Sequence, residues 1–177
     1  MKLISILTTL TLTLTHTAFS QTNTSTEKAN IVRNAYQVQY PKTWKVDSSR
    51  TMGADLFIFS PLENATDKFR ENVNIIIQDL KGQNIDLEKY KQISDKQFAE
   101  LKENIQVFES TVTKLNGKQC YKAMYRLTQG GFKLKVASIC YIKDEKAYLT
   151  TFTSEIDKYE QYKKAGEEIL ASFTLAK

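Results

Sequence analysis

Histidine is nearly missing from this sequence: the 177 residues include one, His16. It falls inside an N-terminal stretch that we expect to be removed as an export signal, so the mature protein has no imidazole group. Catalytic triads that use histidine, zinc sites with histidine ligands and the usual general base near neutral pH are therefore excluded. We expect no catalytic residues, no metal site and no cofactor.

Cysteine is also scarce, with Cys120 and Cys140 as the two thiols. A Cys-x-x-Cys motif is missing, which excludes dithiol redox catalysis. No cysteine lies near the end of the export signal, so the sequence offers no site for a lipid anchor there. The excess of positive charge is small, with a formal net charge of +5 and both signs present. This is not the profile of a nucleic-acid-binding protein, and we expect no nucleic acid partner.

Long apolar runs are lacking, except for one near the N-terminus. Met1-Lys2 gives a positive start, Leu3–Leu14 is apolar but diluted by threonine, and Ala18-Phe19-Ser20 has the small-x-small pattern of a signal peptidase site. The stretch is too short and too polar to span a bilayer stably. We therefore predict a cleaved export signal over residues 1–20, cut near Ser20, and a periplasmic or secreted mature protein without a transmembrane segment. An uncleaved anchor is the alternative.

The rest of the chain is predicted to be a short leader followed by one domain. Residues 21–34 begin with a polar stretch, QTNTSTEKAN, that has no apolar period and is typical of a flexible leader. Residues 35–177 have the size of a single domain with one core.

Within this domain the spacing of apolar residues changes from strand to helix and back. Apolar and β-branched runs predict strands at 35–40, 54–60 and 72–80, followed by a helical period that Asp86 caps and that reaches Ile105. Four strands then follow in series between 107 and 153, with turns at Asn116-Gly117 and Gly130-Gly131. Ser154 is predicted to cap a final helix. This order predicts an α+β fold, an antiparallel sheet with helices packed on it.

Five segments between Ala35 and Leu175 resemble the PsbP-like family. They read YQVQYPKTWKV, FIFSPLENATDKFRENVNIIIQDL, LNGKQCYKAMYRL, KAYLTTFTSEIDKY and EEILASFTL. The family is typified by the extrinsic photosystem II protein and includes exported bacterial relatives, mostly of unknown function. The resemblance implies a PsbP-like α-β-α sandwich, a central antiparallel sheet of about six to seven strands flanked by helices. It also implies a non-enzymatic assembly factor, adaptor or chaperone, but nothing in the sequence singles out a photosynthetic host.

The loop from Ser60 to Asn72 carries three acids spaced four residues apart, Glu63, Asp67 and Glu71. Calcium loops bend back on themselves, usually at a glycine, and this stretch has none. Basic residues among the acids would pair with them, which favours a solvated connection into a strand over a metal site. A loop that contacts a partner is the other alternative, and the resemblance favours it. The candidate contact residues are Glu63, Asp67, Phe69, Arg70 and Asn72.

The pairing of the two cysteines depends on the length of the turn at Gly130-Gly131. A two-residue turn places Tyr121 opposite Cys140 and gives one consistent apolar face, with Cys120 pointing to the other side. A three-residue turn sets Cys120 directly against Cys140 and makes the apolar face less consistent. The oxidising compartment favours a Cys120–Cys140 disulfide, whereas the apolar match favours two buried free thiols.

A candidate basic patch follows from the two-residue turn. It would place four cations on one face of the hairpin, with Arg126 directly opposite Lys135, and like charges in that position repel. The alternatives are an ordinary solvated face and a contact with an anionic partner, either lipid headgroups or an acidic protein surface. The patch residues are Lys122, Arg126, Lys133 and Lys135.

The aromatic residues are mostly at core spacing, although Tyr36, Tyr40 and Trp44 are candidates for lining a pocket. Taken together, the sequence predicts an exported, non-enzymatic binding or assembly module that engages a protein partner or an anionic envelope surface. One alternative is a carrier of a small ligand or lipid in a cavity between sheet and helix. Another is a hydrolase that uses two carboxylates in a cleft.

Overall fold

The computed structural model describes residues 27–176, and the predicted export signal lies outside that range. Within it the chain forms strands, two α-helices and two short 3-10 helices in an order close to the predicted one. These elements are β1 (Lys28–Val32), β2 (Tyr36–Pro41), β3 (Lys45–Asp47), η1 (Thr51–Gly53), β4 (Leu56–Phe59), β5 (Asn72–Asp79), α1 (Leu87–Glu100), β6 (Ile105–Leu115), β7 (Lys118–Gln129), β8 (Phe132–Lys143), β9 (Lys146–Glu155), η2 (Ile156–Lys158), α2 (Tyr159–Ser172) and β10 (Thr174–Leu175).

The main sheet has seven antiparallel strands in the order β3-β4-β5-β9-β8-β7-β6. Its four C-terminal strands form a meander whose turns are Asn116-Gly117, Gly130-Gly131 and Asp144-Glu145. All six turn residues have positive φ, as two-residue primed turns require, because such turns match the right-handed twist of the strands. The predicted antiparallel sheet and its tight turns are confirmed.

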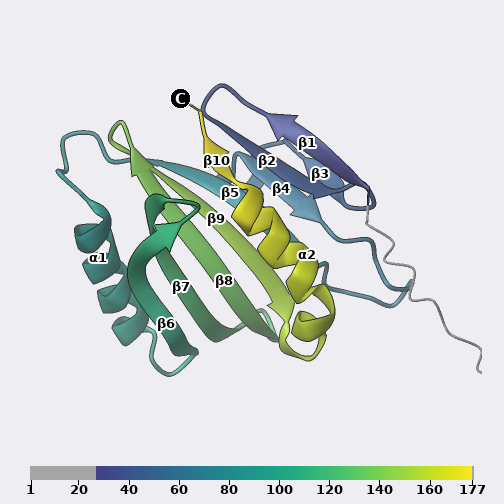
Figure 1. Cartoon of the computed structure of the whole chain (residues 1–177). Coiled ribbons are helices and arrows are strands. Elements are labelled where there is room, and N and C mark those ends of the chain that lie inside the picture. Colours follow the sequence, from purple (N-terminus) through teal and green to yellow (C-terminus); the bar gives the residue numbers. More distant parts are fainter. Residues whose placement is uncertain (1–26, 177) are drawn as a thin grey trace, which may run out of the picture.

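The two helices cover opposite faces of this sheet, which makes the fold an α-β-α sandwich (Figure 1). Strand β7 shows the alternation most clearly. Cys120 and Met124 belong to the core that α2 covers, while Tyr121, Ala123 and Tyr125 belong to the core that α1 covers. The period-2 alternation of a strand supplies both cores from one strand.

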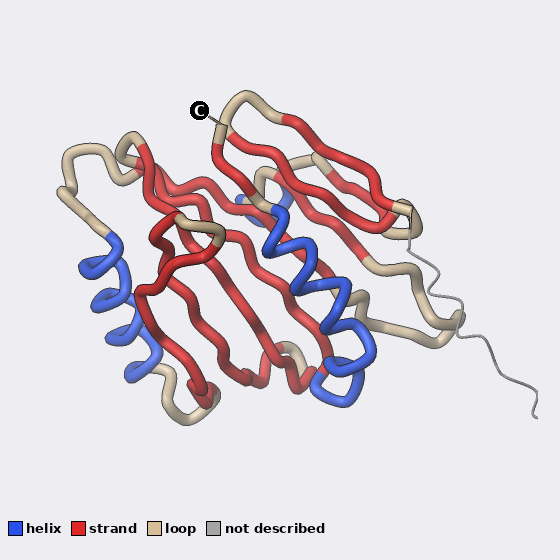
Figure 2. Tube along the Cα trace, viewed as in Figure 1, coloured by secondary structure: helices blue, strands red, loops and turns tan. Residues whose placement is uncertain are grey.

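A second, three-stranded sheet, β1-β2-β10, stands beside α2 (Figures 1 and 2). Strand β1 lies inside residues 21–34, which the sequence suggested to be a flexible leader, so that expectation is wrong from Lys28 onward. The strand is held by antiparallel pairing with β2, by packing of Ile31 against the core and by an ion pair of Lys28 with Glu168 at 2.8 Å. Its sequence, KANIV, mixes polar and apolar residues, and neither face of the strand is fully buried.

The ends of the helices follow the predicted caps only in part. Asp86 caps α1, because its carboxylate accepts a hydrogen bond from the Lys89 N–H at 2.8 Å. The helix ends at Glu100, short of the predicted Ile105, which instead starts β6. Ser154 does not cap α2: it is buried in β9, and α2 begins five residues later after η2. Neither helix of the described residues has the length and apolar character needed to cross a bilayer.

The contact between α2 and the sheet is tight at Gly166. A Cβ atom at this position would lie 2.5 Å from the ring of Phe152, which is completely buried. At this crossing point the helix backbone therefore rests directly on an aromatic ring, and no cavity separates helix and sheet.

Candidate functional site

The acids of the Ser60–Asn72 loop converge on a lysine from a distant part of the chain, Lys158 of η2. Its Nζ lies 3.0 Å from Asp67 Oδ1, 3.2 Å from Glu155 Oε2 and 3.3 Å from Glu63 Oε2. Burial alone would lower the pKa of Lys158, but the hydrogen bonds to these three carboxylates raise it well above its usual range. We call these four residues, with the neighbouring Glu71, the Lys158 cluster. It ties the loop to the start of α2.

Glu71 is the buried member of the Lys158 cluster, with no exposed surface. The Ser60 and Ser154 hydroxyls each donate to its carboxylate, both at 3.4 Å. Burial raises the pKa of Glu71, and the nearby Lys158 charge acts in the opposite direction. The buried Ser154 thus holds a carboxyl group instead of capping a helix.

The other candidate contact residues of the loop also make internal contacts. The Phe69 ring packs against Phe132, with 5.3 Å between centroids, and Arg70 lies 4.9 Å above the ring of Phe59. Asn72 begins β5, and its side-chain amide donates to the Arg70 carbonyl oxygen at 3.0 Å. Across residues 27–176, no group of three or more His, Cys, Asp or Glu side chains is arranged to hold a metal ion. The loop is anchored, and a partner contact there stays a prediction.

The basic patch forms in the predicted register, with Arg126 opposite Lys135. Three of its four cations find their own partners. Lys122 pairs with Glu109 at 3.0 Å, and the Arg126 guanidinium lies 5.1 Å from the centre of an aromatic ring, that of Phe108. Lys135 Nζ lies 3.8 Å above the Tyr159 ring and 3.6 Å from Glu160. The remaining cation of the patch is Lys133. Local partners therefore offset most of the repulsion.

The two cysteines are free thiols, so the alternative with a Cys120–Cys140 disulfide is corrected. The turn at Gly130-Gly131 has two residues, which places Cys140 opposite Tyr121. Cys120 packs in the core covered by α2 and Cys140 in the core covered by α1, on the opposite face. Burial raises the pKa of Cys140 to about 12, so it has little thiolate character.

A cleft of about 630 Å³ lies between the three-stranded sheet and the β3-β4-β5 end of the main sheet. One wall comes from the β1–β2 turn with Arg33 and from Tyr36 of β2. The other comes from the segment after β3, with Ser48 and Arg50, and from Asp55 before β4. We call this hollow the arginine cleft.

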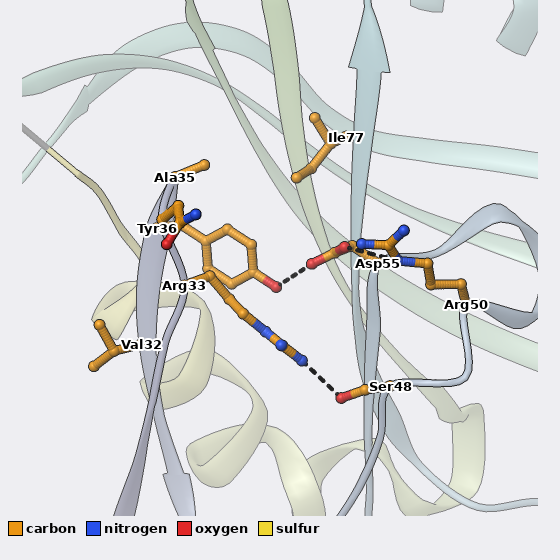
Figure 3. Close-up of a pocket in the computed structure, with 9 residues that line it drawn as sticks. Val32, Arg33, Ala35, Tyr36, Ser48, Arg50, Asp55 and Ile77 are labelled. Carbon is orange, nitrogen blue, oxygen red and sulfur yellow. Dashed lines mark hydrogen bonds and ion pairs between the residues drawn. The ribbon is translucent and has the colours of Figure 1, made fainter.

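Hydrogen bonds cross the arginine cleft from wall to wall (Figure 3). The Tyr36 hydroxyl donates to Asp55 Oδ2 at 2.7 Å, and Arg33 Nη2 donates to Ser48 Oγ at 2.8 Å. Arg50 Nε lies 3.6 Å from Asp55 Oδ1. Burial, and then Asp55, raise the pKa of Tyr36 well above its usual range, so its hydroxyl stays neutral. Two guanidinium groups against one carboxylate leave the cleft with a net positive charge.

Comparison with known proteins assigns the chain to a family. The family model described as PsbP matches residues 30–175, nearly all of the described chain.

The chain belongs to the PsbP family.

Solved structures show the same fold in other members of this structural group. The solution structure of cyanobacterial PsbP (CyanoP) from Synechocystis sp. PCC 6803 matches with a TM-score of 0.62 and 13% identity, over 85% of this chain and 94% of that chain. LpqN of Mycobacterium tuberculosis matches with a TM-score of 0.59 and 17% identity, over 85% and 91%. A Pseudomonas aeruginosa protein of unknown function matches with a TM-score of 0.54 and 12% identity, over 82% and 94%. At these identities the likeness shows the PsbP fold alone. Among curated proteins, none matches by sequence.

The arginine cleft was mostly missed by sequence reasoning. Of the three aromatic candidates for lining a pocket, Tyr36 does line this cleft, while Tyr40 and Trp44 pack with the core. Arg33 fell in the expected leader, and Arg50 in a polar connection with no strand signal. The one usable signal was that both arginines stand in connections next to apolar runs, and this signal does not say that the two connections meet.

Proposed function

We propose that this PsbP-family chain is an exported, non-enzymatic binding module and that the arginine cleft is where it contacts its ligand. One observation carries the proposal: two guanidinium groups from opposite walls reach into a hollow of about 630 Å³ whose one carboxylate is already hydrogen-bonded. Arginine forks with unused N–H donors in a concave site are suited to bind an anionic group.

The charged loop and the basic hairpin that the sequence indicated as contact sites have fewer free charges than the arginine cleft. In the Ser60–Asn72 loop, the acids are paired with Lys158, and the Asp67 side chain is only 3% exposed. In the hairpin, three of the four patch cations have local partners. The arginine cleft keeps its donors facing an open volume, so it is the better binding site.

A role at the cell envelope is supported by a structural relative. LpqN is described as involved in cell envelope biogenesis, and the cyanobacterial relative belongs to the same fold. The predicted export signal of this chain agrees with such a location. Members of the PsbP family are generally non-catalytic, which supports binding over catalysis.

The two alternative functions have less support. A carrier that holds its ligand between sheet and helix needs space there, but Gly166 of α2 lies against the Phe152 ring. A hydrolase needs two carboxylates that reach a substrate. The side chain of Asp67 is nearly buried, and the neighbouring Glu71 is completely buried. Neither arrangement offers a cleft to a ligand.

The experiment that tests the proposal is native mass spectrometry of the protein after export and gentle purification from its own envelope. Wild type is compared with an Arg33→Gln/Arg50→Gln variant, and an Arg126→Gln/Lys133→Gln variant removes the same charge elsewhere as a control. We expect a retained mass in wild type and control that is lost in the cleft variant. A retained mass that survives in the cleft variant, or wild type that never carries one, would contradict the proposal.

A further inference from the structure

We infer that the arginine cleft recognises a phosphate group carried by an amphiphile, a molecule with an anionic head and an apolar part. This inference rests on the proposed function and names its ligand class. Three features of the cleft carry it: the number and placement of its donors, its net charge, and the apolar side chains beside it.

The donors of the arginine cleft exceed what a carboxylate needs. Each guanidinium has five N–H groups in a planar fork, and Arg33 uses one of them to donate to Ser48 Oγ. The Ser48 hydroxyl accepts that bond, which leaves its own proton free to donate. Because the two forks come from opposite walls, they can address oxygens on different sides of a bound group (Figure 3). A phosphate presents more oxygens, in more directions, than the two of a planar carboxylate.

The net charge of the arginine cleft suits a single negative charge. Asp55 offsets one arginine, and both of its oxygens are engaged, one by the Tyr36 hydroxyl and one by Arg50 Nε at 3.6 Å. Its remaining role is to position Arg50, whose side chain is 79% exposed. The neutral Tyr36 hydroxyl adds no charge. One positive charge remains, which matches a phosphodiester, as in a lipid headgroup.

Apolar side chains lie in the arginine cleft and beside it, with Val32 and Ile77 among the residues that line it. Val32 lines the cleft and is 73% exposed, and Met52 follows Arg50 by two residues and is 83% exposed. Two residues of the connection between β3 and β4 have a left-handed backbone conformation, which is uncommon for residues other than glycine. Arg50 has φ of 61° and Met52 has φ of 52°. Non-glycine residues in the left-handed region cluster at functional sites more often than elsewhere. Large apolar side chains that stay exposed beside an anion site suit the apolar part of an amphiphile.

The test uses the exported full-length mature protein and titration calorimetry with a soluble, short-chain phosphatidylglycerol below its micelle concentration. Octanoate is the matched carboxylate probe, and inorganic phosphate is the probe without an apolar part. We expect the short-chain lipid to bind best, with affinity reduced about tenfold or more in Arg33→Gln/Arg50→Gln, since two charge-assisted contacts are lost. Val32→Ser/Met52→Ser is expected to weaken the lipid about threefold or more and to leave inorganic phosphate unchanged. The Arg126→Gln/Lys133→Gln control is expected to bind as wild type does.

Vesicles of phosphatidylglycerol mixed with phosphatidylcholine, compared with phosphatidylcholine alone, identify the source of the phosphate. Binding to the monomeric lipid as tightly as to vesicles supports the inference with a free amphiphile as ligand. Binding to vesicles alone, lost in the cleft variant, supports it with a headgroup in the membrane. Octanoate that binds as tightly as the lipid overturns the phosphate assignment but leaves the cleft as a binding site. Lipid affinity unchanged in Arg33→Gln/Arg50→Gln overturns the inference and, with it, the use of this cleft.

Discussion

At the scale of single residues, Glu71 is an acid that the fold keeps away from water. Burial raises its pKa, so the folded protein holds this proton more tightly than the unfolded chain does. The corresponding stability is present at acid pH and is lost as the pH rises through the raised pKa of Glu71. Burial therefore disfavours the charged form of Glu71, and the nearby Lys158 charge offsets this only in part.

The substitution Glu71→Gln removes this titration while keeping the size of the side chain. We expect the variant to melt at a higher temperature than wild type near neutral pH and at a similar temperature below about pH 4, where ordinary glutamates are protonated. Thermal unfolding followed by circular dichroism across this range checks the prediction. A variant less stable than wild type at every pH would show that the charged form of Glu71 is needed.

Lys158 is the cation on which the loop acids depend. Replacing it by methionine leaves Glu63, Asp67 and Glu155 facing one another. Because the Lys158 side chain is 22% exposed, we discount the cost of breaking a buried pair and expect a loss of about 2 kcal/mol in unfolding free energy.

The matched control for Lys158→Met is Lys163→Met, which breaks an exposed pair with Glu160 at 3.8 Å and should cost less than about 0.5 kcal/mol. Urea unfolding of both variants gives the comparison. Equal losses would contradict the view that the Lys158 cluster anchors the loop.

The cysteines give a further prediction at this scale, because their side chains lie on opposite faces of the sheet. We expect the purified protein to keep both thiols, with no two-hydrogen deficit in its intact mass. A thiol reagent should label Cys120 and Cys140 only after unfolding, since both are buried and burial raises the pKa of each thiol. A deficit of two hydrogens in the native protein would contradict the register described above.

At the scale of elements, α2 depends on one position without a side chain. In an exposed helix Gly→Ala is stabilising, but in Gly166→Ala the new methyl group would meet the buried Phe152 ring at 2.5 Å. Overpacking of this kind costs about 1–3 kcal/mol, so we expect a net loss of stability. Chemical unfolding of Gly166→Ala, alone and combined with Phe152→Leu, measures it. The loss should be smaller in the combined background; an additive double variant would contradict a direct clash.

The elements whose signals are local were predictable from the sequence. Asn116-Gly117 and Gly130-Gly131 fix two turns through their own φ preferences, and Asp86 caps α1 through a bond three residues away. The strand register followed from the apolar match across one short turn. Strand β1 was not predictable, because it is held by pairing with β2 and by contacts with α2, and its five residues follow a long polar stretch. Ser154 looked like a cap because the sequence does not show its bond to Glu71, 83 residues away.

At the scale of the whole molecule, the arginine cleft exists because two sheets meet. Its polar side chains come from two separate stretches, one around Arg33 and one from Ser48 to Asp55, and only the packing of the small sheet beside the large one brings them together (Figure 3). The sequence predicted the α+β fold and the absence of histidine chemistry, but it directed attention to the charged loop and hairpin. The charged side chains of both segments make internal ion pairs and aromatic contacts. The sequence alone does not reveal these contacts, because the partners lie far apart along the chain.

The measurement that tests the central claim most directly is a two-dimensional NMR titration of the purified protein with the short-chain phosphatidylglycerol. We predict that backbone amides of residues 32–36 and 48–55 shift in a saturable way, together with the Nε–H signals of Arg33 and Arg50. The loop at 63–72 and the hairpin at 122–135 should stay unchanged. Saturable shifts confined to that loop or hairpin would contradict the account and return the binding site to the charged segments.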